Sequence, residues 1–268
     1  DLDIRAHNPQ YTSLLLDDLQ WLGLTWDRGP FFQSERTELY QEAILELKQQ
    51  GLLYPCFCSR ADLHAAQAPH ASDGAYVYAG TCRDLSKSER EELSKHKIPA
   101  TRIRVPNKTY AFEDKVYGQT SQNLAKSCGD FIVQRADEVF AYQLAVVVDD
   151  ADMGVTEVVR GSDLLSSTPR QLYLQDVLGL SHPIYAHLPL LVAPDGRRLS
   201  KRNHDLDLGV LRAQGKTPEE ILGFLAYCIG LAEKEEPLSA AQVANRFSWD
   251  VLRAHRKNVV VEHFSHVL

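Results

Sequence analysis

The sequence lacks long apolar runs, a secretory leader pattern and a disulfide framework. No stretch of its 268 residues approaches the ~18 consecutive apolar residues that a transmembrane helix needs, and none resembles a signal peptide. Its five cysteines are an odd number, and two of them flank a single residue, which is a poor geometry for pairing. These absences argue against a membrane protein and a disulfide-stabilised secreted domain, and we expect a cytoplasmic protein.

The sequence also lacks an excess of positive charge. It has 29 Lys and Arg against 36 Asp and Glu, which gives a formal net charge of −7. This balance argues against a protein that coats nucleic acid unspecifically, but it permits a local basic site. The stretch PDGRRLSKRNH at 194–204 is such a site, since after a turn signal it carries four cations within six residues: Arg197, Arg198, Lys201 and Arg202.

The length suits one large or two modest domains, and a hydrophobic content of 44% can fill a sizeable core. Apolar residues recur at helical spacing in 9–24 and in 35–50, and Ser34 is suited to cap the second of these helices. From 55 to about 130, cysteines, turn residues and short alternating runs indicate a second unit with small strands.

Strand and helix patterns then alternate along the chain. Residues 131–135 and 154–161 are typical of buried strands, 142–148 fits either a strand or a helix, and Thr-Pro at 168–169 begins a helix. This alternation predicts a parallel sheet. After residue 205 the pattern indicates helices only.

Five stretches resemble, as an ordered set, the catalytic core of the class I glutamyl-tRNA synthetases. They are WLGLTWDRGPFFQSER (21–36), YPCFCSR (54–60), FAYQLAVVVDD (140–150), TEVVRGSDLLSSTPRQ (156–171) and HLPLLVAPDGRRLSKR (187–202). The resemblance implies an α/β fold with a class I synthetase Rossmann-type parallel sheet, an inserted small zinc-containing α+β unit and a helical C-terminal part. The implied units are a partial nucleotide-binding half (1–54), the zinc unit (55–130), the second half with the signature loop (131–205) and the helical region (206–268).

Within this family, the short members that modify tRNA(Asp) are the most similar. Only 66 residues follow Arg202, which leaves no room for the large anticodon-binding region of a full glutamyl-tRNA synthetase. The short members activate glutamate with ATP and attach it to queuosine in the anticodon of tRNA(Asp). The resemblance therefore implies an ATP-dependent ligase, with Mg²⁺ accompanying ATP, no membrane partner and a monomeric state.

The basic stretch RLSKR resembles the KMSKS signature of class I synthetases. The resemblance makes Lys201 the catalytic cation, which stabilises the charge that develops on the phosphates of ATP in the transition state. The other residues it places at the ATP site are Arg198, Leu199, Ser200 and Arg202. Without the resemblance, the same residues are typical of a solvated basic turn.

Arg160 stands at the end of a strand-like run, where side chains of parallel sheets face the ligand crevice. A guanidinium can bind a carboxylate through two hydrogen bonds. The resemblance assigns Arg160 and Tyr142 to the substrate glutamate. The alternatives are an ion pair of Arg160 with Asp163 or with Asp149 and Asp150, and an ordinary core position for Tyr142.

Three cysteines are candidate zinc ligands, namely Cys56, Cys58 and Cys82. A structural zinc site needs a fourth ligand, and the chemistry of zinc favours His64 or His70. The resemblance instead indicates Tyr78, four residues before the last cysteine. Three reduced cysteines without a metal are the alternative.

Two features of the family are absent from these 268 residues: the HIGH phosphate-binding signature and the acidic substrate ligand that would precede Asp1. Ala6 also stands where the family has an arginine. We expect the missing features upstream of Asp1, because a sheet without its first strand exposes apolar surface. The first alternative function is the catalytic portion of an ordinary glutamyl-tRNA synthetase acting on tRNA(Glu). The second is a non-catalytic zinc-containing RNA-binding relative.

Overall fold

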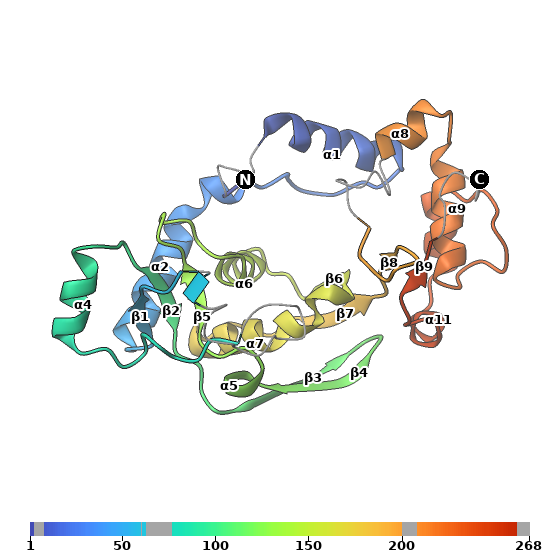
Figure 1. Cartoon of the computed structure of the whole chain (residues 1–268). Helices are drawn as coiled ribbons and strands as arrows, with labels where there is room; N and C mark the ends of the chain where they lie inside the picture. Colours follow the sequence, from blue (N-terminus) through green and yellow to red (C-terminus); the bar gives the residue numbers. More distant parts are fainter. Residues whose placement is uncertain (3–7, 60, 63–76, 200–207, 262–268) are drawn as a thin grey trace.

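Two small sheets and the helices between them form the main body of the protein (Figure 1). The computed structural model describes residues 1–2, 8–59, 61–62, 77–199 and 208–261. The first sheet is antiparallel and has three strands in the order β1 (Leu53–Cys56), β2 (Ala100–Ile103) and β5 (Phe131–Gln134). The second has four strands in the order β4 (Gly118–Asn123), β3 (Thr109–Asp114), β7 (Ile184–Leu188) and β6 (Glu157–Gly161).

The four-stranded sheet is mixed. Strands β6 and β7 are parallel over their whole length, and β3 meets β7 in parallel at the pair Asp114 and Tyr185. Strand β4 returns antiparallel to β3 as a hairpin. The prediction of a parallel sheet is therefore correct only in part, because the β3–β4 hairpin joins this sheet and 131–135 lies in the antiparallel one. The range 55–130 accordingly supplies strands to both sheets.

Helices cover these sheets and enclose the largest core. They are α2 (Thr37–Gln49), α6 (Tyr142–Asp152) and α7 (Thr168–Val177). Side chains with no exposed surface meet there, which include Tyr40, Leu47, Ile103, Leu144 and Leu174. Burying each such aliphatic side chain stabilises the fold by about 2 kcal/mol. The segment 142–148, which was ambiguous between strand and helix, is helical.

Two short 3₁₀ helices lead into helices of this body. The 3₁₀ helix η1 (Gln33–Glu35) precedes α2, and η2 (Ser162–Ser167) leads from β6 into α7. The prediction that Ser34 caps α2 is wrong, because Arg36 is the N-cap and Ser34 lies in η1, where its hydroxyl donates to the carboxylate of Asp1. Helix α4 (Lys87–Ser94) lies between β1 and β2 in the chain, and α5 (Leu124–Ser127) lies between β4 and β5.

The C-terminal region packs on α1 (Pro9–Trp21) through a separate apolar cluster. Its helices are α8 (Leu208–Ala213), α9 (Pro218–Cys228), α10 (Ala240–Asn245) and α11 (Trp249–Ala254). In Figure 1, α8 lies beside α1, and Arg212 of α8 forms ion pairs with Asp17 and Asp18 of α1 at 2.6 and 3.1 Å. Strand β9 (Val259–Val260) pairs with β8 (Leu191–Val192), so the prediction of helices only after 205 is wrong at this point. Among the described helices, none combines the length and apolarity of a membrane span.

Gly223 allows α9 to pack against a backbone segment. A Cβ atom at this position would overlap the carbonyl oxygen of Glu236, while the amide of Leu238 donates to the carbonyl of Glu219 at 2.9 Å. We predict that Gly223→Ala lowers the free energy of unfolding in urea. The overlap costs about 3 kcal/mol, at the severe end of overpacking, and exceeds the gain of about 1 kcal/mol in helix propensity.

Cys228→Ala is the matched control for Gly223→Ala, because it also places an alanine in α9 but adds no atom. The control should unfold near the wild-type urea concentration. A Gly223→Ala variant as stable as the wild type would show that α9 does not pack this closely.

Candidate functional site

Arg160 lies near the end of β6, directly beside His187 of β7 in the parallel register. Its Nε donates to His187 Nε2 at 3.0 Å, and its Nη2 donates to Thr168 Oγ1 at 2.9 Å. The guanidinium also lies over the ring of Tyr185, with its Cζ 5.3 Å from the ring centroid. Nη2 also donates to the carbonyl of Leu164 at 3.5 Å. Within the part of the chain that the structure describes, Nη1 has no hydrogen-bond partner and is available to a ligand.

The ion pairs considered as alternatives for Arg160 do not form among the described residues. Asp163 pairs with Arg198, whose Nη1 lies 2.6 Å from its Oδ2. Asp149 accepts from Arg36 Nε and from Gln33 Nε2, each at 2.7 Å. Asp150 lies within electrostatic range of Arg160, and burial raises the pKa of its carboxyl more than Arg160 lowers it.

His187 connects Arg160 to the fully buried Asp114. The His187 Nδ1 and Asp114 Oδ2 atoms are 2.6 Å apart, and both side chains have no exposed surface. Burial alone would raise the pKa of Asp114, but hydrogen bonds from His187 and from the amides of Tyr117 and Val116 lower it overall. The carboxylate is therefore ionised and accepts the proton of His187 Nδ1, which leaves Nε2 as the acceptor for Arg160.

Tyr142 begins α6 and does not occupy the core, because 48% of its surface is exposed. The core alternative is therefore wrong. Burial raises the pKa of nearby Tyr185, and Arg160, Asp150 and Tyr142 all act electrostatically on the same hydroxyl. The structure thus places Tyr142 and Arg160 within electrostatic range of the same buried tyrosine hydroxyl.

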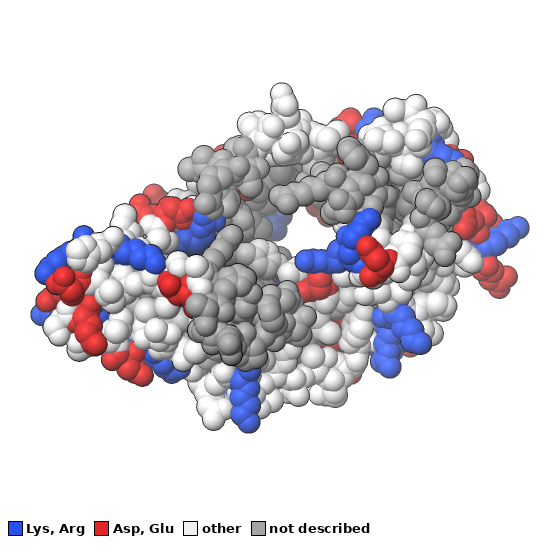
Figure 2. All heavy atoms as spheres, viewed as in Figure 1, with Lys and Arg blue, Asp and Glu red and all other residues white. Residues whose placement is uncertain are grey.

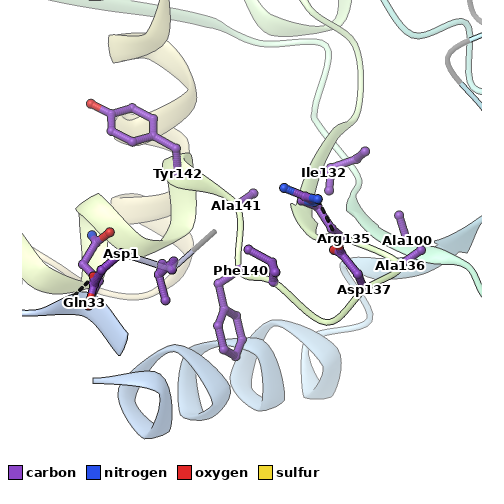
Figure 3. A pocket seen from close by; sticks show the side chains of 12 residues that line it. Asp1, Gln33, Ala100, Ile132, Arg135, Ala136, Asp137, Phe140, Ala141 and Tyr142 are labelled. Carbon is purple, nitrogen blue, oxygen red and sulfur yellow. Dashed lines mark hydrogen bonds and ion pairs between the residues drawn. The ribbon is translucent and has the colours of Figure 1, made fainter. Parts of the chain in front are cut away.

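A pocket of about 860 Å³ opens beside Tyr142. Figure 3 shows Tyr142 and the neighbouring Asp1 and Gln33 on one side of it, and Arg135 with Asp137 on the other. Arg135 Nη2 lies 2.6 Å from Asp137 Oδ2. Arg160 is not among the described residues that line this pocket.

The basic loop is described only up to Leu199. Ser200, Lys201 and Arg202 lie outside the described residues, so the structure does not place the predicted catalytic lysine. Arg198 pairs with Asp163 of η2, the element that directly follows Arg160. A Cβ atom on Gly161 would lie 2.6 Å from Asp163 Oδ1, so a larger residue there would displace the Asp163 side chain. The start of the loop and Arg160 are thus anchored on one short segment, 160–163.

The three candidate thiols cluster as predicted. The Sγ atoms of Cys56, Cys58 and Cys82 lie within 4.8 Å of one another. The hydroxyl of Tyr78 is 3.7 Å from the first Sγ and 3.9 Å from the second, and it accepts the Cys82 amide at 2.7 Å. His64 and His70 lie outside the described residues. Three sulfurs and one phenol oxygen at these separations fit a tetrahedral metal ion.

Arg102 supports this cluster from β2. Its Nε donates to Cys56 Sγ at 3.1 Å, and its guanidinium stacks on the Tyr78 ring at 3.8 Å. Although burial alone would raise it, the pKa of Cys56 is lowered by Arg102, while burial raises the pKa of Cys58 to about 12. A cation beside one thiol favours the thiolate form that binds metals.

Two partners of Arg160, His187 and Thr168, and the partner of His187, Asp114, were not predicted from the sequence. His187 and Thr168 stand inside quoted motifs, HLPL and SSTP, and a histidine in a buried strand is a usable signal. Asp114 carries no local signal, because it contacts His187 across 73 residues of sequence.

Charged side chains form no continuous basic band on the described surface that faces the viewer in Figure 2, where Lys and Arg alternate with Asp and Glu and the face is hollowed near its centre. Arg253 of α11, a cation considered for RNA contact, pairs with Asp250 at 2.8 Å. A nucleic-acid partner would therefore meet local cations on this face.

Comparison with known proteins identifies the family. Residues 1–265 match the family model described as tRNA synthetases class I (E and Q), catalytic domain. A curated protein named glutamyl-Q tRNA(Asp) synthetase from Symbiobacterium thermophilum is 46% identical over 272 residues, which cover 97% of this chain and 83% of that protein. A protein of the same name from Rhodopirellula baltica is 42% identical, with 98% and 85% covered.

The fold is similar to the crystal structure of glutamate-tRNA synthetase from Elizabethkingia anophelis. The TM-score is 0.77 at 23% identity, and the match covers 97% of this chain and 59% of that one. A glutamate tRNA ligase from Elizabethkingia meningosepticum, crystallised with its amino acid, gives a TM-score of 0.76 at 23% identity with the same coverage. These likenesses show the class I synthetase α/β fold. With the family match over nearly the whole chain, they establish that this protein belongs to the class I tRNA synthetases (E and Q).

Proposed function

We propose that this protein is an ATP-dependent ligase that activates glutamate and transfers it to queuosine in the anticodon of tRNA(Asp). The observation that carries the proposal is the identity of 42–46% to several proteins named glutamyl-Q tRNA(Asp) synthetase over 86–98% of this chain. Arg160 supports it, because among its described contacts Nη1 makes no hydrogen bond and can donate to a carboxylate. A cytoplasmic location and a monomeric state are part of the same proposal.

Glutamate binds with one carboxylate on Nη1 of Arg160 and with a hydrogen bond to the hydroxyl of Tyr142. His187 holds Nε, and Nη2 donates to Thr168 and to the Leu164 carbonyl, so Nη1 is the nitrogen that remains for the substrate among the described contacts. Tyr185 excludes water from one face of the guanidinium, which strengthens this charge-assisted pairing.

The other carboxylate attacks the α-phosphorus of ATP. The bond between the α- and β-phosphates breaks, pyrophosphate leaves with the bonding electrons, and glutamyl adenylate remains. Lys201, with Arg198, Leu199, Ser200 and Arg202 beside it, stabilises the charge on the phosphates, and such a contact contributes about 3–4 kcal/mol to catalysis. Mg²⁺ accompanies ATP and neutralises part of the same charge. A hydroxyl of the queuosine cyclopentene ring then attacks the carbonyl and displaces AMP.

Cys56, Cys58, Cys82 and Tyr78 hold a structural Zn²⁺ in this proposal. The ion supplies folding energy to a unit whose apolar cluster is small, since its buried members are Cys56, Tyr78 and Cys82 with Tyr54 and Phe57. It takes no part in the reaction.

The direct test is glutamate-dependent exchange between ATP and pyrophosphate with the full-length protein, followed by transfer of labelled glutamate. We expect exchange without tRNA, and transfer to tRNA(Asp) that contains queuosine but not to tRNA(Asp) that lacks it. Charging of tRNA(Glu) alone would select the ordinary glutamyl-tRNA synthetase activity. Failure of exchange would select the non-catalytic RNA-binding alternative.

Arg160→Lys should raise the KM for glutamate in the exchange assay. Lysine keeps the charge but loses the planar guanidinium that His187 and Thr168 orient, and the loss of about 2 kcal/mol or more corresponds to at least about 30-fold. The KM for ATP should change little. Arg135→Lys is the matched control, because Arg135 lines the pocket beside Tyr142 but pairs with Asp137. Equal effects of the two variants on glutamate would contradict the assignment of Arg160.

Cys58→Ser should abolish stoichiometric zinc in the purified protein, as measured by elemental analysis, and should lower the melting temperature. Cys228→Ser is the control, since this half-buried thiol lies in α9 outside the cluster, and it should leave the zinc content unchanged. Metal-free wild-type protein with an unchanged melting temperature would contradict the structural zinc.

A further inference from the structure

Asp114 at the end of β3 and His187 in β7 form a buried polar pair between neighbouring strands of the four-stranded sheet. Neither side chain is exposed to solvent, and a buried polar group is costly unless its hydrogen bonds are complete. All the ring nitrogens and carboxylate oxygens of this pair do have partners. A pair of this kind lies directly behind the arginine that receives the substrate in the proposed function.

The two carboxylate oxygens of Asp114 accept hydrogen bonds from different groups. Oδ1 accepts from the amides of Val116 and Tyr117 at 2.9 Å each and from the amide of His187 at 3.3 Å, so it fixes the β3–β4 turn. Oδ2 faces His187 Nδ1 at 2.6 Å. The carboxylate therefore fixes which ring nitrogen carries the proton, because an ionised oxygen only accepts.

The proton on Nδ1 makes His187 Nε2 an acceptor, and Arg160 Nε donates to it at 3.0 Å. Thr168 Oγ1 accepts from Nη2 at 2.9 Å, so two nitrogens of the planar guanidinium are held and the plane cannot rotate. The fixed plane also fixes the direction in which the remaining Nη1 can donate to a ligand. If the proton moved to Nε2, two donors would face each other and Arg160 would lose this contact.

We propose that Asp114 and His187 are positioning residues for the substrate carboxylate: they hold His187 as the Nδ1–H tautomer so that Arg160 is oriented before glutamate binds. This inference rests on the proposed function, in which Arg160 binds glutamate. A preoriented guanidinium loses less conformational freedom on binding, so Asp114 and His187 contribute to affinity without touching the substrate.

Asp114→Asn is the sharpest test because it is isosteric. Three amides need an acceptor, so the amide oxygen takes the place of Oδ1 and the NH₂ group takes the place of Oδ2. His187 Nδ1 must then accept, and its proton moves to Nε2, opposite Arg160 Nε. We expect the KM for glutamate in ATP–pyrophosphate exchange to rise by about 10- to 100-fold, as for the loss of a hydrogen bond to a charged group. The KM for ATP should stay within about twofold.

Asp130→Asn is the matched control. Asp130 is also almost fully buried, and it accepts from Tyr54 OH at 2.6 Å and from the Val105 amide at 2.7 Å, beside the cysteine cluster. It has no contact with His187 among its described partners, so its loss should leave the KM for glutamate unchanged even if stability falls. If only Asp114→Asn raises the KM for glutamate, the effect comes from the orientation of Arg160. A general requirement for a buried carboxylate would affect both variants.

The tautomer of His187 can be read in the wild-type protein by ¹⁵N NMR of labelled histidine, with the signal assigned through a His187→Gln variant. We expect a protonated Nδ1 and a bare Nε2 in the wild type, and the reverse in Asp114→Asn. A protonated Nε2 in the wild type would overturn the proposal even if Asp114→Asn did not fold.

Different results would overturn the positioning role of Asp114 and His187 and the binding of glutamate by Arg160. If Arg160→Lys leaves the KM for glutamate unchanged, Arg160 does not bind the substrate and both assignments fall. If Arg160→Lys raises this KM but folded Asp114→Asn does not, Arg160 binds glutamate without help from His187, and only the positioning role is overturned.

Discussion

The hydrogen bond between Arg160 and His187 depends on the parallel register of β6 and β7. Parallel neighbours lie about 4.8 Å apart, and their side chains point to the same face at matched positions. The register sets the arginine and the histidine side by side at the strand ends, where α/β sheets bind ligands. Because η2 and α7 follow at once, the same corner also brings Thr168 to the guanidinium and Asp163 to the base of the basic loop.

The cysteine cluster is built by a different network, in the antiparallel sheet. Arg102 of β2 donates to Cys56 and to the carbonyl of Asp130, and the Asp130 carboxylate accepts from Tyr54. Complete hydrogen bonding makes such a buried polar group rigid, whereas a single unsatisfied member would be costly. The protein thus has two rigid polar centres, one behind Arg160 and one behind the thiols, and each is completed by a strand from the range 55–130 that pairs within its own sheet.

Local sequence signals predicted much of this arrangement. Helical periodicity located α1 and α2, and the ordered motifs identified the family and the clustered cysteines. Sheet membership was less predictable, because an alternating run such as β3 can pair with any neighbour, and the β3–β4 hairpin turns the expected parallel sheet into a mixed one. Asp114 was missed for the same reason: its role arises only when β3 meets β7.

The most direct test of the account is a crystal structure of the full-length protein with a non-reactive analogue of glutamyl adenylate. The account predicts that a carboxylate of the glutamyl group accepts from Nη1 of Arg160, while Nε remains on His187 and the hydroxyl of Tyr142 contacts the same ligand. An analogue bound with its carboxylate away from Arg160, or an Arg160 that leaves His187 to pair with Asp150, would contradict it.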